Sequence, residues 1–189
     1  MMQSPSIQVH AFEPLSLTNG PGKRAVLWVQ GCLLNCPGCF NPATHPLNAG
    51  QNCSCDQIFD WIKPLENSVE GITISGGEPL LQPLALRYLL RRIRQETSLS
   101  IIIFTGYTWE AVRRDPQYQP LFSLTDLLIA GPYLRAARVA SGLVGSSNKT
   151  FHFFTDRYTQ NDFSQIPSSE VILNENGEIR LSGIDPLQW

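Results

Sequence analysis

Three cysteines with a ligand-like spacing are the clearest chemical feature of the sequence. Cys32, Cys36 and Cys39 form a Cys-x3-Cys-x2-Cys motif directly after a run of apolar, strand-forming residues. A cubane iron–sulfur cluster normally takes four cysteine thiolates, so three from one loop leave one iron without a protein ligand. A catalytic metal centre needs such an open position, because the substrate must reach the metal. The triplet therefore predicts a redox-active [4Fe-4S] cluster with one open iron.

A structural zinc site is the alternative. Zinc needs a fourth ligand, and His45, Cys53 and Cys55 are the candidates. Two close cysteine pairs would be the stronger zinc signal, whereas this sequence has a triplet followed by Cys-x-Cys. Five cysteines, three of them clustered, favour thiol ligands in a reducing compartment over disulfides. We interpret Cys53 and Cys55 as free thiols, with an additional metal site as the alternative.

The elements that must position the triplet read as repeated β–α units. Short apolar runs alternate with helical patterns, which is typical of a mostly parallel sheet. Strands are expected at about residues 25–30, 71–75, 100–105 and 126–130. Helices are expected at residues 55–65, 83–96 and 107–114. The first three strands are continuously apolar, as expected when both faces of a sheet are covered. The cysteine loop then lies at the carboxyl ends of the strands, where open α/β folds bind ligands.

The C-terminal part has a different pattern. Residues 170–174 and 178–182 flank Glu175-Asn176-Gly177, which predicts a β-hairpin with its turn at Asn-Gly. Residues 134–147 are rich in Ala, Gly and Ser, and we expect a mobile loop there. No internal repeat or linker interrupts the chain, so we expect one domain over residues 1–189.

Composition narrows the class of function. The formal net charge is −2 and no basic run stands out, so we expect no nucleic-acid partner. We expect no membrane partner either, because the apolar runs are far too short to span a bilayer. The N-terminus has no basic start followed by an apolar stretch, and we therefore expect a cytoplasmic location. Charged residues make up 16% of the chain, which favours a protein partner or an oligomer of unassigned size.

The cysteine motif, followed after the next strand by Gly76-Gly77-Glu78-Pro79, resembles the radical S-adenosylmethionine superfamily. Within it the sequence is similar to the glycyl-radical-enzyme activases, above all to those of anaerobic ribonucleotide reductases. The matching segments run in order from about residue 7 to residue 183, and they are Gly20-Pro21-Gly22-Lys23-Arg24, Val29-Gln30-Gly31-Cys32, Cys39-Phe40-Asn41-Pro42, Ser75-Gly76-Gly77-Glu78-Pro79-Leu80, Gly106-Tyr107-Thr108, Gly131-Pro132-Tyr133 and Gly145-Ser146-Ser147-Asn148.

The resemblance implies a partial, open TIM-like barrel of about five to six parallel β–α units with a C-terminal β-hairpin, because a complete barrel usually needs a longer chain. It also implies that S-adenosylmethionine (SAM) chelates the open iron through its amino and carboxylate groups. One electron, from an external donor such as flavodoxin or ferredoxin, then splits the sulfonium bond. The resulting 5′-deoxyadenosyl radical removes a hydrogen from a glycine of a partner enzyme, and the expected partner is an anaerobic ribonucleotide reductase.

The resemblance further implies a set of SAM contacts. Glycines at 76 and 77 allow close backbone approach to the methionine part, and Glu78 offers an acceptor for its ammonium. Phe40 is expected to cover the adenine or to shield the cluster from solvent. For the segments that contain Gly76, Gly77 and Gly106, the alternative is an ordinary turn between a strand and a helix. The expected contacts are Phe40, Asn41, Ser75, Gly76, Gly77, Glu78, Pro79, Thr105, Gly106 and Tyr107. No catalytic residue is expected beyond the cluster and SAM ligands.

Several departures from the family pattern weaken the assignment of the protein substrate, but not that of the cluster. Asn19 and Ala130 replace acidic residues that the family usually carries, and His45 replaces a common aromatic residue. An activase of a glycyl-radical enzyme is the leading hypothesis. A small radical enzyme acting on a metabolite or another protein is the second, and a non-catalytic metal-binding or electron-transfer protein is the third. A short, open barrel favours a macromolecular substrate.

Overall fold

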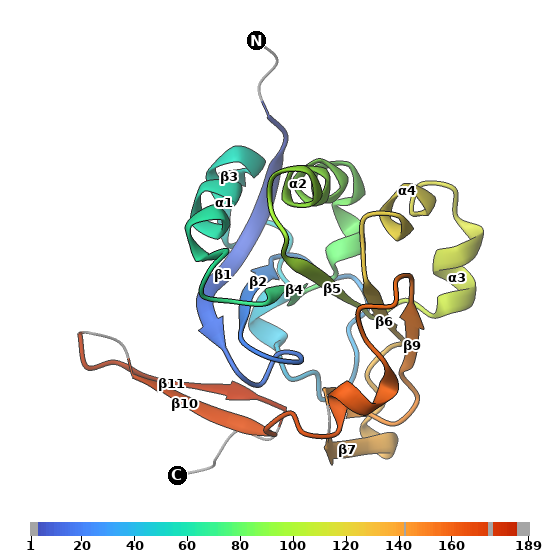
Figure 1. Cartoon of the computed structure of the whole chain (residues 1–189). Helices are drawn as coiled ribbons and strands as arrows, with labels where there is room; N and C mark the ends of the chain where they lie inside the picture. The colour runs from blue at the N-terminus through green and yellow to red at the C-terminus, as the bar shows by residue number, and fades with distance from the viewer. Residues whose placement is uncertain (1–3, 142, 174–175, 185–189) are drawn as a thin grey trace.

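The computed structural model describes residues 4–141, 143–173 and 176–184, and a seven-stranded mixed sheet forms its centre (Figure 1). The strand order is β3-β1-β2-β4-β5-β6-β9. Four neighbouring strands run parallel: β2 (Arg24–Val29), β4 (Gly71–Gly76), β5 (Ser100–Thr105) and β6 (Leu127–Ala130). The other three pair antiparallel: β1 (Ser6–Ser16), β3 (Gln51–Ser54) and β9 (Thr150–Phe153).

The sequence correctly predicts the four parallel strands, but the sheet differs from the expected five to six parallel units. Antiparallel strands extend it on both sides instead. The long strand β1 is missing from the prediction because polar residues and Pro14 interrupt its apolar pattern, and its pairing with β2 shifts register between Glu13 and Ser16. Closure of this sheet into part of a barrel stays a prediction.

The helices follow the sequence prediction closely. They are α1 (Cys55–Ile62), α2 (Pro83–Glu96), α3 (Trp109–Arg114) and the single turn α4 (Gln119–Phe122). The hydroxyl of Ser54 caps α1 by accepting the N–H of Gln57 at 3.1 Å, and Thr108 caps α3 in the same way. Short 3-10 helices lie at Pro42–Thr44, Lys63–Leu65, Pro79–Leu81, Arg135–Ala137 and Gln160–Phe163. None of the helices in the described part of the chain is long and apolar enough to cross a membrane.

The two faces of the parallel strands have different surroundings. Because side chains alternate along a strand, Leu27, Ile74 and Ile103 face α1 and α2 and form the main core with them. Both helices lie on the same side of the sheet in Figure 1. The opposite face carries Ile102 and Leu127, part of a smaller cluster with the C-terminal segment. The α-helices of the described residues thus cover one face, and the part of the second face outside the smaller cluster is left for the cavity described below.

The C-terminal hairpin is confirmed to within one residue at each end. Strands β10 (Ser169–Leu173) and β11 (Ile179–Gly183) pair antiparallel and extend away from the central sheet (Figure 1). Asn174, at the end of the first expected strand, and Glu175, in the expected turn, lie outside the described residues.

Residues 134–147 form structure where the composition predicts a loop. Strands β7 (Arg138–Ser141) and β8 (Val144–Ser146) pair antiparallel there. The composition does not reveal this strand pairing, because Ala, Gly and Ser have weak strand propensity. The expected mobility of the segment stays a prediction.

Candidate metal centre

The three cysteines line one cavity of about 360 Å³. The segment Ser75–Gly76–Gly77 at the end of β4 and Thr105–Gly106 at the end of β5 line the same cavity. Its wall includes Trp28 and Phe104, from the sheet face without helices. The carboxyl ends of three parallel strands thus meet the cysteine loop at one site, as the sequence predicts.

Backbone hydrogen bonds fix the cysteine loop. The N–H of Cys32 donates to the carbonyl of His45 at 3.0 Å, and the N–H of Cys39 donates to the carbonyl of Cys36 at 3.1 Å. Asn35 and Gly38 take left-handed conformations, with φ of 46° and 74°. The N–H of Asn41 points at the sulfur of Cys39 at 3.4 Å, a contact that stabilises a thiolate. These contacts fix the backbone of the loop whose three cysteines line the cavity.

The cavity is lined by cysteines, which become negative as thiolates, and by one lysine, which is positive. Burial raises the pKa of the Cys32 thiol, and the nearby charges of Glu78, Cys36 and Cys39 raise it further. A cationic metal group that binds all three sulfurs would overcome this cost by stabilising the thiolates. Lys149 also lines the cavity, where its ammonium donates to the carbonyl of Gly131 at 2.6 Å.

The donor set fits a cluster with one open iron better than a single metal ion. Within residues 4–141, 143–173 and 176–184, no group of three or more His, Cys, Asp or Glu side chains is arranged to hold one ion. In a cubane each thiolate binds a different iron, so the three sulfurs need not converge on one point. Cys53 and Cys55 are fully buried in the main core, where the Cys55 thiol donates to the carbonyl of Ala85 at 3.3 Å. Neither lines the cavity, so neither is placed to complete a zinc site.

Glu78 lies beneath the cavity rather than on its surface. Its side chain is fully buried, and burial raises its pKa. Its carboxylate accepts the N–H of Leu80 at 2.9 Å, the hydroxyl of Thr105 at 2.8 Å and the N–H of Gly106 at 2.7 Å. Both carboxylate oxygens are thus already engaged by the protein. In this structure Glu78 joins the end of β4 to the end of β5.

The two glycines after β4 have a structural requirement of their own. A Cβ on Gly76, whose φ is +107°, would lie 2.5 Å from backbone atoms of Val29. A Cβ on Gly77 would lie 2.3 Å from the carbonyl oxygen of Gly31. Packing against the strand that leads into the cysteine loop therefore requires glycine here, independently of any ligand.

Phe40 connects the cysteine loop to residues 133–145. Its ring centre lies 4.7 Å from that of Tyr133 and 5.3 Å from the guanidinium carbon of Arg138. A Cβ on Gly145 would lie 2.3 Å from the Phe40 ring, so β8 packs directly on it. Tyr133 and Gly145 line the cavity together with Phe40.

Seven of the ten expected cofactor contacts line the cavity: Phe40, Asn41, Ser75, Gly76, Gly77, Thr105 and Gly106. Glu78, Pro79 and Tyr107 do not, and the ring of Tyr107 instead stacks on Tyr118 with centres 6.3 Å apart. Sequence reasoning missed Trp28, Phe104 and Lys149. The two aromatic residues occupy alternate positions in strands that read as uniformly apolar, so the pattern gives no signal for them.

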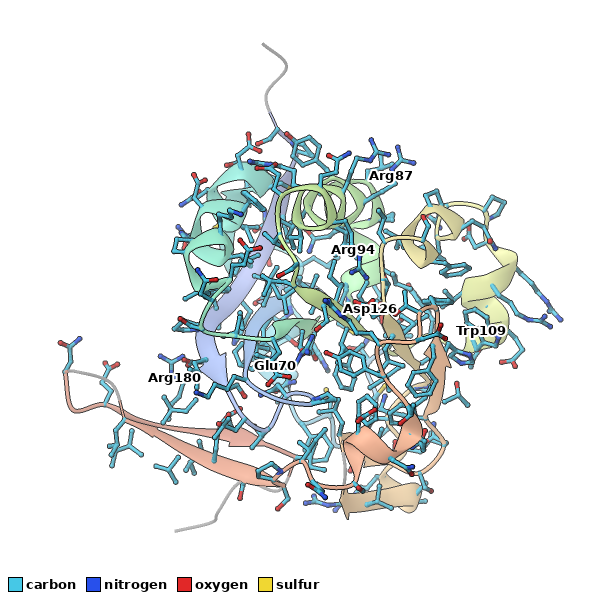
Figure 2. All side chains as sticks on the ribbon, in the orientation of Figure 1. Glu70, Arg87, Arg94, Trp109, Asp126 and Arg180 are labelled. Atoms are coloured by element: carbon cyan, nitrogen blue, oxygen red, sulfur yellow. The ribbon has the colours of Figure 1, made fainter. Side chains whose placement is uncertain are left out.

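The C-terminal hairpin forms one side of the cavity, which the sequence does not reveal. Ile172, Arg180 and Ser182 line it. The guanidinium of Arg180 reaches the carboxylate of Glu13 on β1 at 3.0 Å, and Figure 2 shows Arg180 extending from the hairpin toward that strand. Glu13 is 5% exposed, so this ion pair holds the hairpin to a buried carboxylate.

Asn19, one of the departures from the family pattern, contacts the hairpin as well. Its side-chain amide donates to the hydroxyl of Ser16 at 2.8 Å and to that of Ser182 at 2.9 Å. Glu170 of the hairpin accepts hydrogen bonds from Ser16, Thr18 and the N–H of Leu17. A carboxylate from the hairpin thus lies beside the position where the family usually carries an acid.

Two buried charged groups lie outside the cavity and hold the scaffold. Arg24 is fully buried and donates to Thr73 and Tyr158, each at 2.7 Å. Asp126 accepts the N–H of Ile101 at 2.7 Å and lies 2.6 Å from the guanidinium of Arg94 on α2, a pair visible near the centre of Figure 2. Asp126 therefore has a structural role.

Comparison with known proteins gives consistent matches. A family described as a 4Fe-4S single cluster domain matches residues 18–152. An anaerobic ribonucleoside-triphosphate reductase-activating protein of Vibrio cholerae is 32% identical over 154 residues, which cover 77% of this chain and 97% of the relative. A protein of the same name from Escherichia coli K12 is 33% identical over 151 residues, or 76% and 96% of the two chains. A pyruvate formate-lyase-activating enzyme of Clostridium pasteurianum is 32% identical over 126 residues, or 65% of this chain and 50% of that one. The crystal structure of QueE from Escherichia coli aligns with a TM-score of 0.45 at 16% identity, over 55% of this chain and 53% of that one.

Proposed function

The chain belongs to the family of anaerobic ribonucleoside-triphosphate reductase-activating proteins, with a 4Fe-4S single cluster domain, and on that premise we propose that it generates a glycyl radical on a partner enzyme. It is a radical SAM enzyme. When bound, the [4Fe-4S] cluster and SAM supply the one-electron cleavage that yields a 5′-deoxyadenosyl radical, which removes hydrogen from the partner's glycine. The anaerobic ribonucleotide reductase is the proposed partner.

One observation of this structure supports the proposal most directly. Cys32, Cys36 and Cys39 are gathered on one cavity, while Cys53 and Cys55 are fully buried elsewhere. The protein thus offers three thiolates to the cluster, and the fourth iron stays open for the cofactor.

The residues of the chain have distinct tasks in this reaction. The three cysteines hold the cluster, and the carboxyl ends of β4 and β5 are proposed to bind SAM. Lys149 provides a positive charge in the same cavity. Phe40, Tyr133 and the hairpin cover the cavity, which excludes water from a reactive radical. We also propose that residues 1–189 act as one domain in the cytoplasm, and that the sheet, with the described α-helices on one face, forms an open partial barrel.

The test uses the whole protein, reconstituted with iron and sulfide without oxygen. After reduction with dithionite and addition of SAM, we expect release of 5′-deoxyadenosine. With the anaerobic ribonucleotide reductase of the same genome present, a carbon-centred glycyl signal should appear in electron paramagnetic resonance (EPR) spectra. Release of 5′-deoxyadenosine without a glycyl signal on any glycyl-radical enzyme would favour a metabolite substrate. Absence of both would refute the proposal.

A further inference from the structure

The C-terminal hairpin lies outside the residues that match the 4Fe-4S family. The family match ends at residue 152, whereas β10 and β11 span Ser169–Leu173 and Ile179–Gly183. The hairpin nevertheless lines the same cavity as the three cysteines. It therefore adds a wall to the site that the matched part of the chain does not supply.

The edge of β11, rather than one of its faces, borders the cavity. Residues 180–184 line the cavity without interruption. Side chains of successive strand residues point to opposite faces, so an unbroken run of lining residues indicates that the cavity follows the edge of the strand. Figure 1 shows β11 on the side of the hairpin nearer the central sheet, which agrees with this placement.

This edge of β11 has no strand partner among the described residues. On its other side β11 pairs with β10 in a two-stranded sheet. The N–H of Ile184 donates to the carbonyl of Ser168 at 3.0 Å, so these two residues form a hydrogen-bonded pair. Hydrogen-bonded and non-hydrogen-bonded pairs alternate along an antiparallel ladder, and Leu181 pairs with Val171 in a non-hydrogen-bonded position. The backbone N–H and C=O of Leu181 therefore point away from β10, to the free edge.

The polar face of the hairpin fixes this edge in place. Glu170 and Ser182 lie opposite each other in the ladder, and Arg180 lies on the same face two residues from Ser182. Arg180 pairs with Glu13 at 3.0 Å, and the hydroxyl of Ser182 accepts the side-chain amide of Asn19 at 2.9 Å. An edge held in this way is preorganised, so a segment that binds to it does not have to order it first.

A glycine has no side chain, so the target of the proposed reaction offers only its backbone for recognition. A free strand edge binds an extended peptide through main-chain hydrogen bonds. Building on the proposed function, we propose that the free edge of β11 pairs with an extended, glycine-containing segment of the partner enzyme. The pairing places that segment along one wall of the cavity that the three cysteines also line.

The test removes one N–H from the free edge without removing a ladder hydrogen bond. Leu181→Pro does this, because proline has no N–H and the N–H of Leu181 does not point to β10. Val171→Pro is the matched control, because Val171 lies directly opposite Leu181, its backbone faces the other edge of the hairpin, and it does not line the cavity. Leu181→Ala controls for the loss of the leucine side chain.

Binding is measured by fluorescence anisotropy on cluster-loaded protein with SAM present. The probe is a labelled peptide that spans the radical glycine of the anaerobic ribonucleotide reductase of the same genome. Leu181→Pro should raise the Kd by about ten-fold or more, because a main-chain hydrogen bond is lost and the proline ring obstructs the incoming strand. Val171→Pro and Leu181→Ala should keep most of the affinity. Release of 5′-deoxyadenosine without peptide should be the same in all four proteins.

A second measurement uses the wild type alone and is independent of how well the variants fold. Two peptides are compared, each N-methylated at one of two neighbouring residues beside the glycine. A paired strand directs alternate N–H groups to its partner, so one of these peptides should bind about ten-fold more weakly than the other. Equal affinities of the two peptides would overturn the assignment of the edge.

The outcomes separate the edge assignment from the proposed function. Equal Kd values for Leu181→Pro and Val171→Pro, or no binding of the peptide to the wild type, would overturn the assignment. So would a Leu181→Pro variant that keeps its cluster but no longer cleaves SAM, because the edge would then serve the cofactor. If the peptide binds as expected but the whole reductase never shows a glycyl signal, the proposed function fails while the edge assignment stands.

Discussion

The carboxylate of Glu78 accepts the backbone N–H of Gly106 at 2.7 Å, and this hydrogen bond joins the ends of two neighbouring parallel strands. The other carboxylate oxygen accepts from Leu80 and Thr105. Residues at the ends of both strands line the cavity, whereas Glu78 does not. Its hydrogen bonds therefore hold the two strand ends together without Glu78 itself lining the cavity. An acidic residue in this motif can therefore support a ligand site without touching the ligand.

Replacement of Glu78 tests this role. Glu78→Gln places an amide NH2 among three hydrogen-bond donors, and we expect a loss of about 1–3 kcal/mol in the free energy of unfolding. Denaturant unfolding of the cluster-free protein measures it, with Glu110→Gln at the exposed start of α3 as the matched control. Unchanged stability combined with weaker SAM binding would instead indicate direct contact between Glu78 and the cofactor.

The cysteine assignment predicts a sharp difference between two groups of thiols. Cys36→Ala removes one of three cluster ligands, so iron content, visible absorption and the EPR signal of the reduced cluster should be largely lost. Cys53→Ala removes a core thiol and should retain all three signals. Iron analysis after anaerobic reconstitution makes the comparison. Equal loss of iron in both variants would favour a metal site that includes Cys53.

Gly77 is expected to be intolerant of a side chain even without cofactor. In Gly77→Ala the new Cβ meets the carbonyl oxygen of Gly31 at 2.3 Å, and backbone atoms cannot move away cheaply. A destabilisation of about 1–3 kcal/mol should follow. Gly106→Ala is the control, because its Cβ meets the flexible end of Leu34 at the same distance. Similar melting temperatures for the two variants would argue against this packing requirement.

The sequence predicts well wherever local pattern and pairing agree. The apolar runs that become β4 and β5, and the amphipathic stretch of α2 with its stripe of Leu86, Leu89 and Leu90, match the structure closely. The cysteine triplet also predicts its own site, because a loop after a parallel strand can only lie at the carboxyl edge of the sheet.

Other features depend on contacts between distant residues and leave no local signal. Strand β1 is identified only by its partners on both sides. Lys149 follows a segment rich in Gly and Ser, and nothing in its neighbourhood predicts that it reaches the cavity. The hairpin pattern is visible in the sequence, but its contact with Glu13 is not, because that contact spans almost the whole chain.

The attachment of the hairpin can be tested through Glu170. Its carboxylate accepts from the hydroxyl of Ser16 at 2.5 Å and from the N–H of Leu17 at 2.8 Å. Glu170→Gln should weaken these bonds, and hydrogen exchange of β10 and β11 should become several-fold faster while exchange in β4 and β5 stays unchanged. Asp60→Asn on the exposed side of α1 is a charge-matched control. Faster exchange throughout the sheet would indicate a global effect instead.

Lys149 provides the final prediction, which concerns cofactor affinity. Its ammonium lies in the cavity, and burial lowers its pKa, an effect opposed by the charges of Cys36, Glu78 and Cys39. A positive charge held in a partly buried cavity favours an anionic group, and the carboxylate of the amino-acid part of SAM is such a group.

Removal of this charge should therefore weaken SAM binding without removing the cluster. Hydrogen bonds between charged groups contribute about 1.5–3 kcal/mol, so Lys149→Met should raise the Kd for SAM by about ten- to a hundred-fold. Anaerobic calorimetry measures the Kd, and iron content confirms that the cluster is present. Lys149→Arg keeps the charge and should recover part of the affinity. If Lys149→Met binds SAM normally but shifts the reduction potential of the cluster, Lys149 interacts with the thiolates and not with the cofactor carboxylate.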